Sequence, residues 1–96
     1  MNASYKLSQE AKDDLQRIYE YGFLNFGEQQ ADDYFFGFFE TFEKIASYPL
    51  HYQSVDNIRV GYKRCPYRSD TIYFRVNGQR VEIMAIIGGQ DTDVWL

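Results

Sequence analysis

The chain has 96 residues and a formal net charge of -4, and we expect one domain over residues 1–96 with a modest core. Hydrophobic residues make up 45% of it and aromatic residues 19%, which excludes a disordered chain and predicts a core rich in Phe and Tyr. Cys65 is the one cysteine, which excludes a disulfide framework and a multi-cysteine metal site, and the sequence indicates no cofactor. There is no signal-peptide segment and no run near the ~20 apolar residues of a membrane span, so we expect a cytoplasmic protein.

The first half of the chain predicts a short strand followed by two helices. Residues 4–7 suit a strand, and Ser8 suits the N-cap of a helix that Gly27 ends. A second helix begins near Glu28 and ends before Pro49, and so short a break predicts that the two helices pack as an antiparallel hairpin. The residues predicted to face the core are Ala11, Leu15, Ile18, Gly22 and Phe26 in the first helix and Ala31, Phe35, Phe38, Phe42 and Ile45 in the second.

The second half changes to the two-residue period of strands. Residues 59–64 are predicted as one strand that ends at Pro66, and two further strands flank Asn77-Gly78, the favoured pair for a two-residue hairpin loop. The predicted fold class is α+β, with an N-terminal α-helical hairpin packed on a small antiparallel β-sheet in the order β-α-α-β-β-β.

A loop at Asn77-Gly78 fixes the predicted register of this hairpin. The predicted pairs are Val76 with Gln79, Arg75 with Arg80, Phe74 with Val81, Tyr73 with Glu82 and Ile72 with Ile83. Ile72, Phe74, Val81, Ile83 and Ala85 would then line the face that the helices cover. Directly opposed arginines are unfavourable, so this register places a concentrated positive charge on the other face.

Positive charge is concentrated in one part of this acidic chain. Residues 1–50 carry four basic and nine acidic residues, whereas residues 51–96 carry six basic and five acidic ones. Four of the basic residues lie in RVGYKRCPYR, residues 59–68. Tyr62, Tyr67 and Tyr73 are interleaved with the basic residues of this half of the chain. The guanidinium groups either lie in water, or form a basic face for an acidic protein or for nucleic acid. Interleaved tyrosines suit base stacking and a protein interface equally.

The two helices carry more aromatic residues than one face can bury. Phe23 and Leu24 lie off the predicted core face of the first helix, and Phe36 and Phe39 lie off or at the border of that of the second. Clustered on one hairpin, these side chains predict a partner groove. Gly37, inside the second helix, either lets another backbone approach closely or has no specific role.

Residues suited to catalysis are sparse. His51 is the only histidine and has no nucleophile or second ligand near it in sequence, which indicates a surface or loop role. The pairs Asp13-Asp14 and Asp32-Asp33 are expected to lie in solvent on the helices. The sequence therefore predicts no catalytic and no metal-binding residue.

Four segments, in this order and spacing, resemble the RelE/ParE superfamily of toxin–antitoxin toxins, and within it the ParE branch. They are YKLSQEAKDDLQRIYEYGFLNFGEQQADDYF (5–35), IASYP (45–49), NIRVGYKRC (57–65) and TIYFRVNGQRVEIMAIIGGQD (71–91). No single motif is diagnostic, but together the segments cover nearly the whole chain.

The resemblance implies a toxin that inhibits DNA gyrase by binding, without enzymatic activity, and that a ParD-like antitoxin neutralises in a heteromeric complex. Contact with DNA would come only through the antitoxin. The basic residues assigned to the target are Arg59, Lys63, Arg64, Arg68, Arg75 and Arg80. The residues assigned to the antitoxin are Phe23, Leu24, Phe36, Phe39, Tyr62 and Tyr73.

Two alternatives remain open within this superfamily. RelE-type relatives cut mRNA on the ribosome and commonly carry a His or Tyr towards the C-terminus, whereas this chain has no His, Tyr, Lys or Arg after Arg80. Many ParE-like chains carry R-V/I-L-H where this one has residues 85–88, AIIG, which leaves weak toxicity or another target open. The second alternative is an inactive toxin that acts only as an antitoxin-binding co-repressor.

Overall fold

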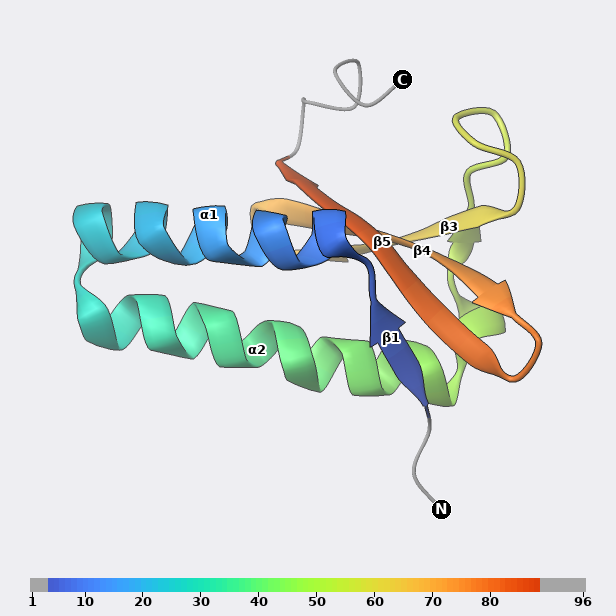
Figure 1. The fold of residues 1–96 in the computed structure, drawn as a ribbon, viewed down its shortest axis with the longest axis horizontal. Coiled ribbons are helices and arrows are strands. Elements are labelled where there is room, and N and C mark those ends of the chain that lie inside the picture. The colour runs from blue at the N-terminus through green and yellow to red at the C-terminus, as the bar shows by residue number, and fades with distance from the viewer. Residues whose placement is uncertain (1–3, 89–96) are drawn as a thin grey trace.

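The structure is a computed structural model that describes residues 4–88, and it has a helical hairpin packed on one face of a five-stranded sheet (Figure 1). The α+β class and the helical hairpin are confirmed. The elements are β1 (Tyr5–Leu7), α1 (Gln9–Phe26), α2 (Glu28–Ser47), the 3-10 turn η1 (Pro49–His51), β2 (Gln53–Ser54), β3 (Tyr62–Tyr67), β4 (Asp70–Asn77) and β5 (Arg80–Gly88).

The helix boundaries follow the predicted capping residues. The Ser8 hydroxyl accepts a hydrogen bond from the Ala11 amide at 3.0 Å, and α1 ends at Gly27, whose φ of 90° suits glycine. Phe26, predicted to face the core, is instead 58% exposed. The helices are longer than the sheet that they cover, so the joined ends of α1 and α2 extend beyond it (Figure 1). Nothing in the described chain covers Phe26 there.

The sheet is mixed and not purely antiparallel as predicted, because its first strand is parallel to its last. The strand order is β1-β5-β4-β3-β2, and β1 pairs in parallel with β5 while every other pair is antiparallel. A parallel pair needs a crossover, and the helical hairpin provides it. Strand β2 is a short addition that the sequence did not predict.

The β4–β5 register differs from the predicted one by two residues near the loop. The loop is Gly78-Gln79, with Gly78 at φ 64°, so Arg75 pairs with Glu82 and not with Arg80. The other observed pairs are Asn77 with Arg80, Val76 with Val81, Phe74 with Ile83, Tyr73 with Ala85 and Ile72 with Ile86. With Gly78 at the first loop position, the positive φ falls on glycine and Asn77 stays in the strand. This register places the opposite charges of Arg75 and Glu82 across from each other.

This two-residue shift leaves most side chains on the predicted face, because strand faces alternate with a period of two. Ile72, Phe74, Val81 and Ile83 all lie in the core beneath the helices. Ala85 is the exception, because a register irregularity at Tyr73/Phe74 pairs it with Tyr73 on the opposite face. Ile86 takes the core position instead.

Strand β3 begins and ends later than predicted. Residues 59–61 lie in a turn, and the strand runs through Pro66 to Tyr67. Strand β2 pairs only with Lys63 and Arg64, so Pro66 lies where that edge of β3 has no strand partner, and its missing N–H costs little there.

The core lies between the helices and the sheet, and a small second cluster lies on the other face of the sheet. The main cluster comprises Ala11, Leu15, Phe38, Phe42, Ile45, Cys65, Ile72, Phe74, Val81, Ile83 and Ile86. The second cluster comprises Val55, Tyr62 and Tyr73, with Ile58, Met84 and Ile87 against it. We call the face that carries this second cluster the outer face.

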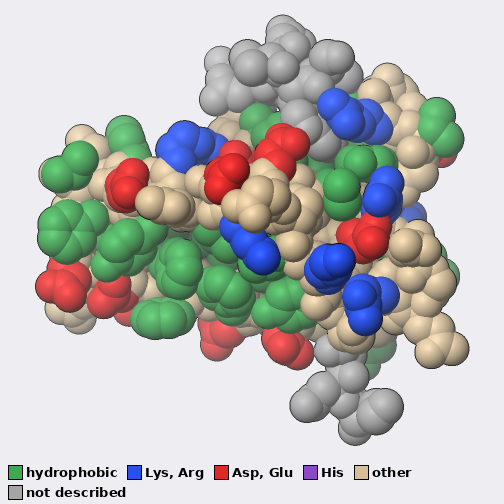
Figure 2. All heavy atoms as spheres, viewed as in Figure 1, with side chains coloured by type: hydrophobic (Ala, Val, Ile, Leu, Met, Phe, Trp, Pro, Cys, Tyr) green, Lys and Arg blue, Asp and Glu red, His purple; other side chains and the backbone are tan. Residues whose placement is uncertain are grey.

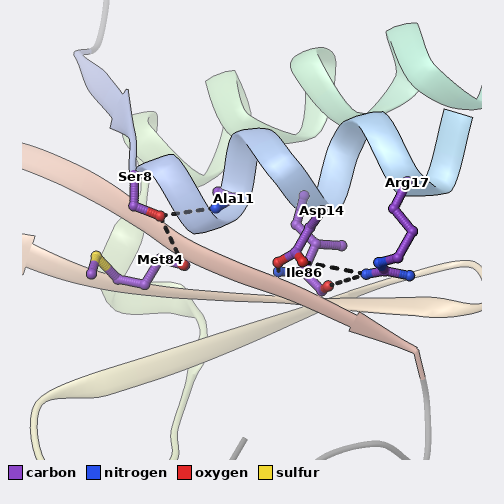
Figure 3. Close-up of polar contacts among 6 residues, drawn as sticks. All are labelled: Ser8, Ala11, Asp14, Arg17, Met84 and Ile86. Atoms are coloured by element: carbon purple, nitrogen blue, oxygen red, sulfur yellow. Dashed lines mark hydrogen bonds and ion pairs between the residues drawn. The ribbon is translucent and has the colours of Figure 1, made fainter.

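Polar side chains of α1 bind the edge of β5 beyond its pairing with β1 (Figure 3). The Ser8 hydroxyl donates to the Met84 carbonyl at 2.8 Å, and the Asp14 carboxylate accepts from the Ile86 amide at 2.9 Å. Arg17 donates to the Ile86 carbonyl at 3.4 Å. The prediction that Asp14 lies in solvent is therefore wrong, because its carboxylate binds a backbone N–H in the part of β5 that β1 does not cover.

Candidate partner-binding surfaces

A largely apolar groove of about 560 Å³ runs along the helical hairpin on the side where β1 lies. Figure 2 shows hydrophobic side chains gathered in a band along the two helices. The groove, called the hairpin groove below, is lined by Leu7, Lys12, Leu15, Gln16, Tyr19, Asp32, Phe35, Phe36 and Phe39. An elongated apolar surface between two helices has the shape that a partner helix requires.

Helical spacing builds this groove from both helices. Phe35 and Phe39, four residues apart on α2, lie with ring centroids 5.1 Å apart, and the Tyr19 ring of α1 meets Phe35 edge-on at 5.5 Å. The Tyr19 hydroxyl donates to the Asp32 carboxylate at 2.7 Å, and this hydrogen bond raises the pKa of Tyr19. The aromatic wall is thus held in place before any partner binds.

The structure separates the residues that the sequence assigned to an antitoxin. Phe36, 62% exposed, and Phe39 line the hairpin groove, while Phe23 and Leu24 are exposed near the hairpin tip outside it. Tyr62 and Tyr73 are only 8% and 3% exposed and lie on the outer face of the sheet. These two rings pack in the second cluster, so we leave them out of the proposed binding surface.

Of the nine residues that line the groove, the sequence predicted only Phe36 and Phe39. Among the apolar and aromatic members, Leu15 and Phe35 were assigned to the core, where Leu15 does lie, and Leu7 and Tyr19 were assigned to no surface. Phe35 is only half-buried because it lies at the boundary between the core and the groove. The i, i+4 spacing of Phe35 and Phe39 could have shown from the sequence that the two rings lie side by side on the helix. The position of β1 beside the hairpin could not have been predicted from the sequence.

The six basic residues do not form one patch. Cross-strand partners place Arg64 and Arg75 on the outer face opposite Tyr73 and Tyr62. Lys63 pairs with Phe74 and so lies on the helix-covered side, where its ammonium donates to the Tyr52 carbonyl at 3.2 Å.

The remaining basic residues lie in three different places. Arg80 pairs with Asn77 at the hairpin end, and the Arg59 guanidinium lies 5.9 Å from the centre of the Tyr62 ring. Arg68 lies in the β3–β4 turn.

Glu82 reduces the positive character of the outer face. Its carboxylate accepts a hydrogen bond from the Arg75 guanidinium at 2.6 Å and one from the Asn77 amide at 3.4 Å. The hydrogen bond from Arg75 lowers the pKa of Glu82, and the same contact raises the pKa of Arg75. The predicted pair of opposed arginines is therefore wrong, and an ion pair occupies that position.

The described residues bring together no cluster typical of a catalytic or metal centre. His51 stacks on Tyr48, with ring centroids 5.2 Å apart. Cys65 is buried, and burial raises the pKa of its thiol, which disfavours the reactive thiolate. Within residues 4–88 there is no group of three or more His, Cys, Asp or Glu side chains that could hold a metal ion. No helix in this range is long and apolar enough to cross a membrane.

A helical hairpin with an apolar groove, packed on a small mixed sheet, defines a small α+β domain. Residues 5–92 match the family described as the ParE toxin of the type II toxin–antitoxin system parDE. The chain belongs to this ParE toxin family. The last part of the matched range, residues 89–92, lies outside the described residues.

Two relatives named toxin ParE1 are similar over most of their length. The protein of Caulobacter vibrioides is 41% identical over 83 residues, which span 86% of this chain and 85% of the relative. That of Mycobacterium tuberculosis strain H37Rv is 29% identical over 79 residues, 82% of this chain and 81% of the relative. A solved structure titled as the chromosomal ParDE system from P. aeruginosa has the same fold, with a TM-score of 0.81 at 19% identity over 92% of this chain and 97% of that one.

Proposed function

We propose that this ParE-family toxin acts by binding DNA gyrase, without enzymatic chemistry, and that a ParD-like antitoxin neutralises it. The proposal of an antitoxin partner rests on the hairpin groove, an open and largely apolar groove of about 560 Å³. The chain belongs to a family of toxins from toxin–antitoxin systems. An amphipathic antitoxin helix would place its apolar face against Phe35, Phe36 and Phe39. Such a partner also explains why large aromatic side chains remain exposed.

The proposed target surface is the outer face of the sheet. Arg64, Arg75 and Arg80 lie there, with Arg59 at its margin, and they suit an acidic protein surface. The RelE-type ribonuclease alternative needs basic groups converging on one phosphate. Lys63 points to the other side, and Arg75 is engaged by Glu82, so this arrangement supports binding better than phosphate chemistry.

Expression of the toxin without an antitoxin tests the proposal directly. We expect growth arrest with DNA damage, and we expect the purified protein to slow gyrase supercoiling or to trap cleaved DNA. Cleavage of ribosome-bound mRNA with unaffected gyrase would support the ribonuclease alternative instead. Normal growth together with tight antitoxin binding would indicate an inactive toxin that serves as a co-repressor.

The antitoxin site is tested by a charge placed in the hairpin groove. Phe36→Asp removes an exposed ring from this surface, and we expect binding of the protein encoded beside the toxin gene to weaken by about tenfold or more. Leu50→Asp is the matched control, because Leu50 is also exposed but lies outside the groove. Titration calorimetry measures both affinities, and an equal loss in the two variants would contradict the assignment.

A further inference from the structure

A second cavity lies where both helices meet the end of the sheet. It has a volume of about 740 Å³ and is enclosed by α1, α2 and the β3–β4 turn. Figure 1 shows that the β3–β4 end of the sheet passes behind α1, away from β1. Ile18, Tyr21, Phe26 and Phe35 supply an apolar wall, and Arg17 and Arg68 supply positive charge. We call this cavity the arginine pocket.

Arg68 is held in an unusual backbone conformation at the rim of the pocket. Its φ of 53° lies in the left-handed region, and it is the only non-glycine residue between 4 and 88 with a positive φ. Such a conformation is unfavourable for an arginine, and residues that retain it are enriched at functional sites. Glycine or asparagine would suit this turn better, so the arginine side chain itself is the feature to explain.

Two tyrosines form a platform for the Arg68 guanidinium. It lies 5.9 Å from the centre of the Tyr34 ring and 5.8 Å from that of the Tyr67 ring. The Tyr67 hydroxyl donates to the Tyr34 carbonyl at 3.0 Å, and the Tyr34 hydroxyl donates to the Asp70 carboxylate at 2.6 Å. These bonds join the helix to the turn and fix both rings, so the guanidinium is oriented before a ligand arrives.

The positive charges of the pocket are incompletely compensated. Arg68 forms no ion pair within residues 4–88. The acidic residue that lines the pocket, Asp70, already accepts a hydrogen bond from the Tyr34 hydroxyl. Arg17 uses one terminal nitrogen, Nη2, for two long contacts of 3.4 Å, to the Asp14 carboxylate and to the Ile86 carbonyl, and its side chain is 60% exposed. Around them, α1 and α2 carry three basic and nine acidic residues, so the pocket is a positive site on an acidic hairpin.

We propose that the arginine pocket binds an acidic peptide segment, with a carboxylate held between Arg17 and Arg68 and a neighbouring apolar side chain against Ile18 and Phe35. Arginine suits this role because its planar guanidinium donates two parallel hydrogen bonds to a carboxylate. The site is separate from the hairpin groove, although Tyr19 and Phe35 contribute to both cavities. It does not depend on which protein the toxin inhibits.

A random peptide library displayed on phage tests this site without assuming a partner. We expect peptides selected on the purified protein to carry Asp or Glu close to an aromatic or aliphatic residue. Arg68→Gly should weaken their binding by about tenfold or more, as loss of a charge-assisted hydrogen bond predicts. The same substitution relieves the positive φ, so the unfolding midpoint should stay level or rise, and misfolding cannot explain the lost binding.

Lys44→Ala is the matched control for charge. It removes one positive charge from an exposed residue of α2 that lies outside the arginine pocket and outside the outer face of the sheet, and it should leave peptide affinity within a factor of about two. The proposal is overturned if the selected peptides lack acidic residues, or if they bind the Arg68→Gly protein as tightly as the wild type. It is equally overturned if the two variants lose the same affinity, because the attraction would then be a general charge effect.

Discussion

Gly37 shows how one residue fixes the distance between α2 and the sheet. A Cβ atom at this position would lie 2.9 Å from Cζ of Tyr67 and still closer to the Tyr67 hydroxyl. Tyr67 approaches so closely because its hydroxyl bonds to the Tyr34 carbonyl on the same helix. The glycine is therefore required by a side chain of β3, and the reading of Gly37 as a residue without a role is wrong.

Gly37→Ala should destabilise the protein although alanine favours helices. Overpacking costs roughly 1–3 kcal/mol, which exceeds the about 1 kcal/mol that alanine gains in helix propensity. Gly22→Ala is the control, because its Cβ would meet the Ala31 Cβ at an ordinary 3.5 Å, and it should be neutral or stabilising. Urea unfolding measures both changes, and equal effects would contradict the contact.

The β4–β5 register is tested by exchanging charges between Arg75 and Glu82. Glu82→Arg alone opposes two positive charges and should lower the unfolding midpoint, and the double variant Arg75→Glu/Glu82→Arg should recover it. Because the pKa of Glu82 is lowered in the folded state, its contribution is present above the ordinary glutamate pKa and is lost as the pH falls through the folded value. If the double variant does not recover the midpoint near neutral pH, the pairing of Arg75 with Glu82 is contradicted.

At the scale of elements, the contact between α1 and β5 replaces a missing strand. Strand β1 pairs with residues 81–83 only, and side chains of α1 satisfy the backbone at Met84 and Ile86. Asp14 accepts from the Ile86 N–H and Arg17 donates to its carbonyl, so the two side chains imitate the pairing of a strand (Figure 3). An edge covered in this way is protected from pairing with other chains.

Asp14→Ala should cost about 1–3 kcal/mol, because it leaves the buried Ile86 amide without its acceptor. Asp13→Ala removes the same charge from the neighbouring exposed residue and should change stability by less than about 0.5 kcal/mol. Thermal unfolding compares the two variants, and light scattering reports whether the uncovered edge promotes association. Similar stabilities for both variants would show that the Asp14 contact contributes little.

At the scale of the whole molecule, polar side chains attach the helical hairpin to the sheet at two separate places. Near the start of α1, Ser8 and Asp14 bind β5, and beyond the first turn of α2, Tyr34 binds Asp70 at the β3–β4 turn. The hairpin groove lies on one side of these attachments and the arginine pocket on the other. The relative position of helices and sheet therefore determines both candidate surfaces.

The Tyr34–Asp70 attachment predicts a loss of stability at alkaline pH. Burial, followed by the hydrogen bond to Asp70, raises the pKa of Tyr34 above the ordinary tyrosine value of about 10. The contribution of Tyr34 to the free energy of unfolding is therefore fully present below about pH 10, and it is lost as the pH rises through the pKa of Tyr34 in the folded protein. Tyr34→Phe should reduce the alkaline slope of the urea midpoint, and Tyr48→Phe, which alters an exposed ring outside both cavities, should leave it unchanged. An unaltered slope in the Tyr34 variant would contradict this assignment.

The sequence predicted part of each candidate surface. Phe36 and Phe39 were identified because their helical spacing sets them off the core face, and they line the hairpin groove. Tyr62 and Tyr73 were placed at the surface, but strand alternation does not reveal that residues 55–58 fold over the outer face and cover them. The arginine pocket was not predicted, because it brings together Arg17 and Arg68, which lie far apart in the chain.

By itself, the sequence determined the two helices, four of the five strands, their order and most of the core face. Capping residues, helical periodicity and strand alternation act between near neighbours, so Ser8 and Gly27 could be assigned without a structure. The tertiary structure decided the parallel pairing of β1, the loop at Gly78-Gln79 and the ion pair of Arg75 with Glu82. It also decided the role of Asp14 at the β5 edge. These features depend on packing between distant segments, whose energies no local pattern records.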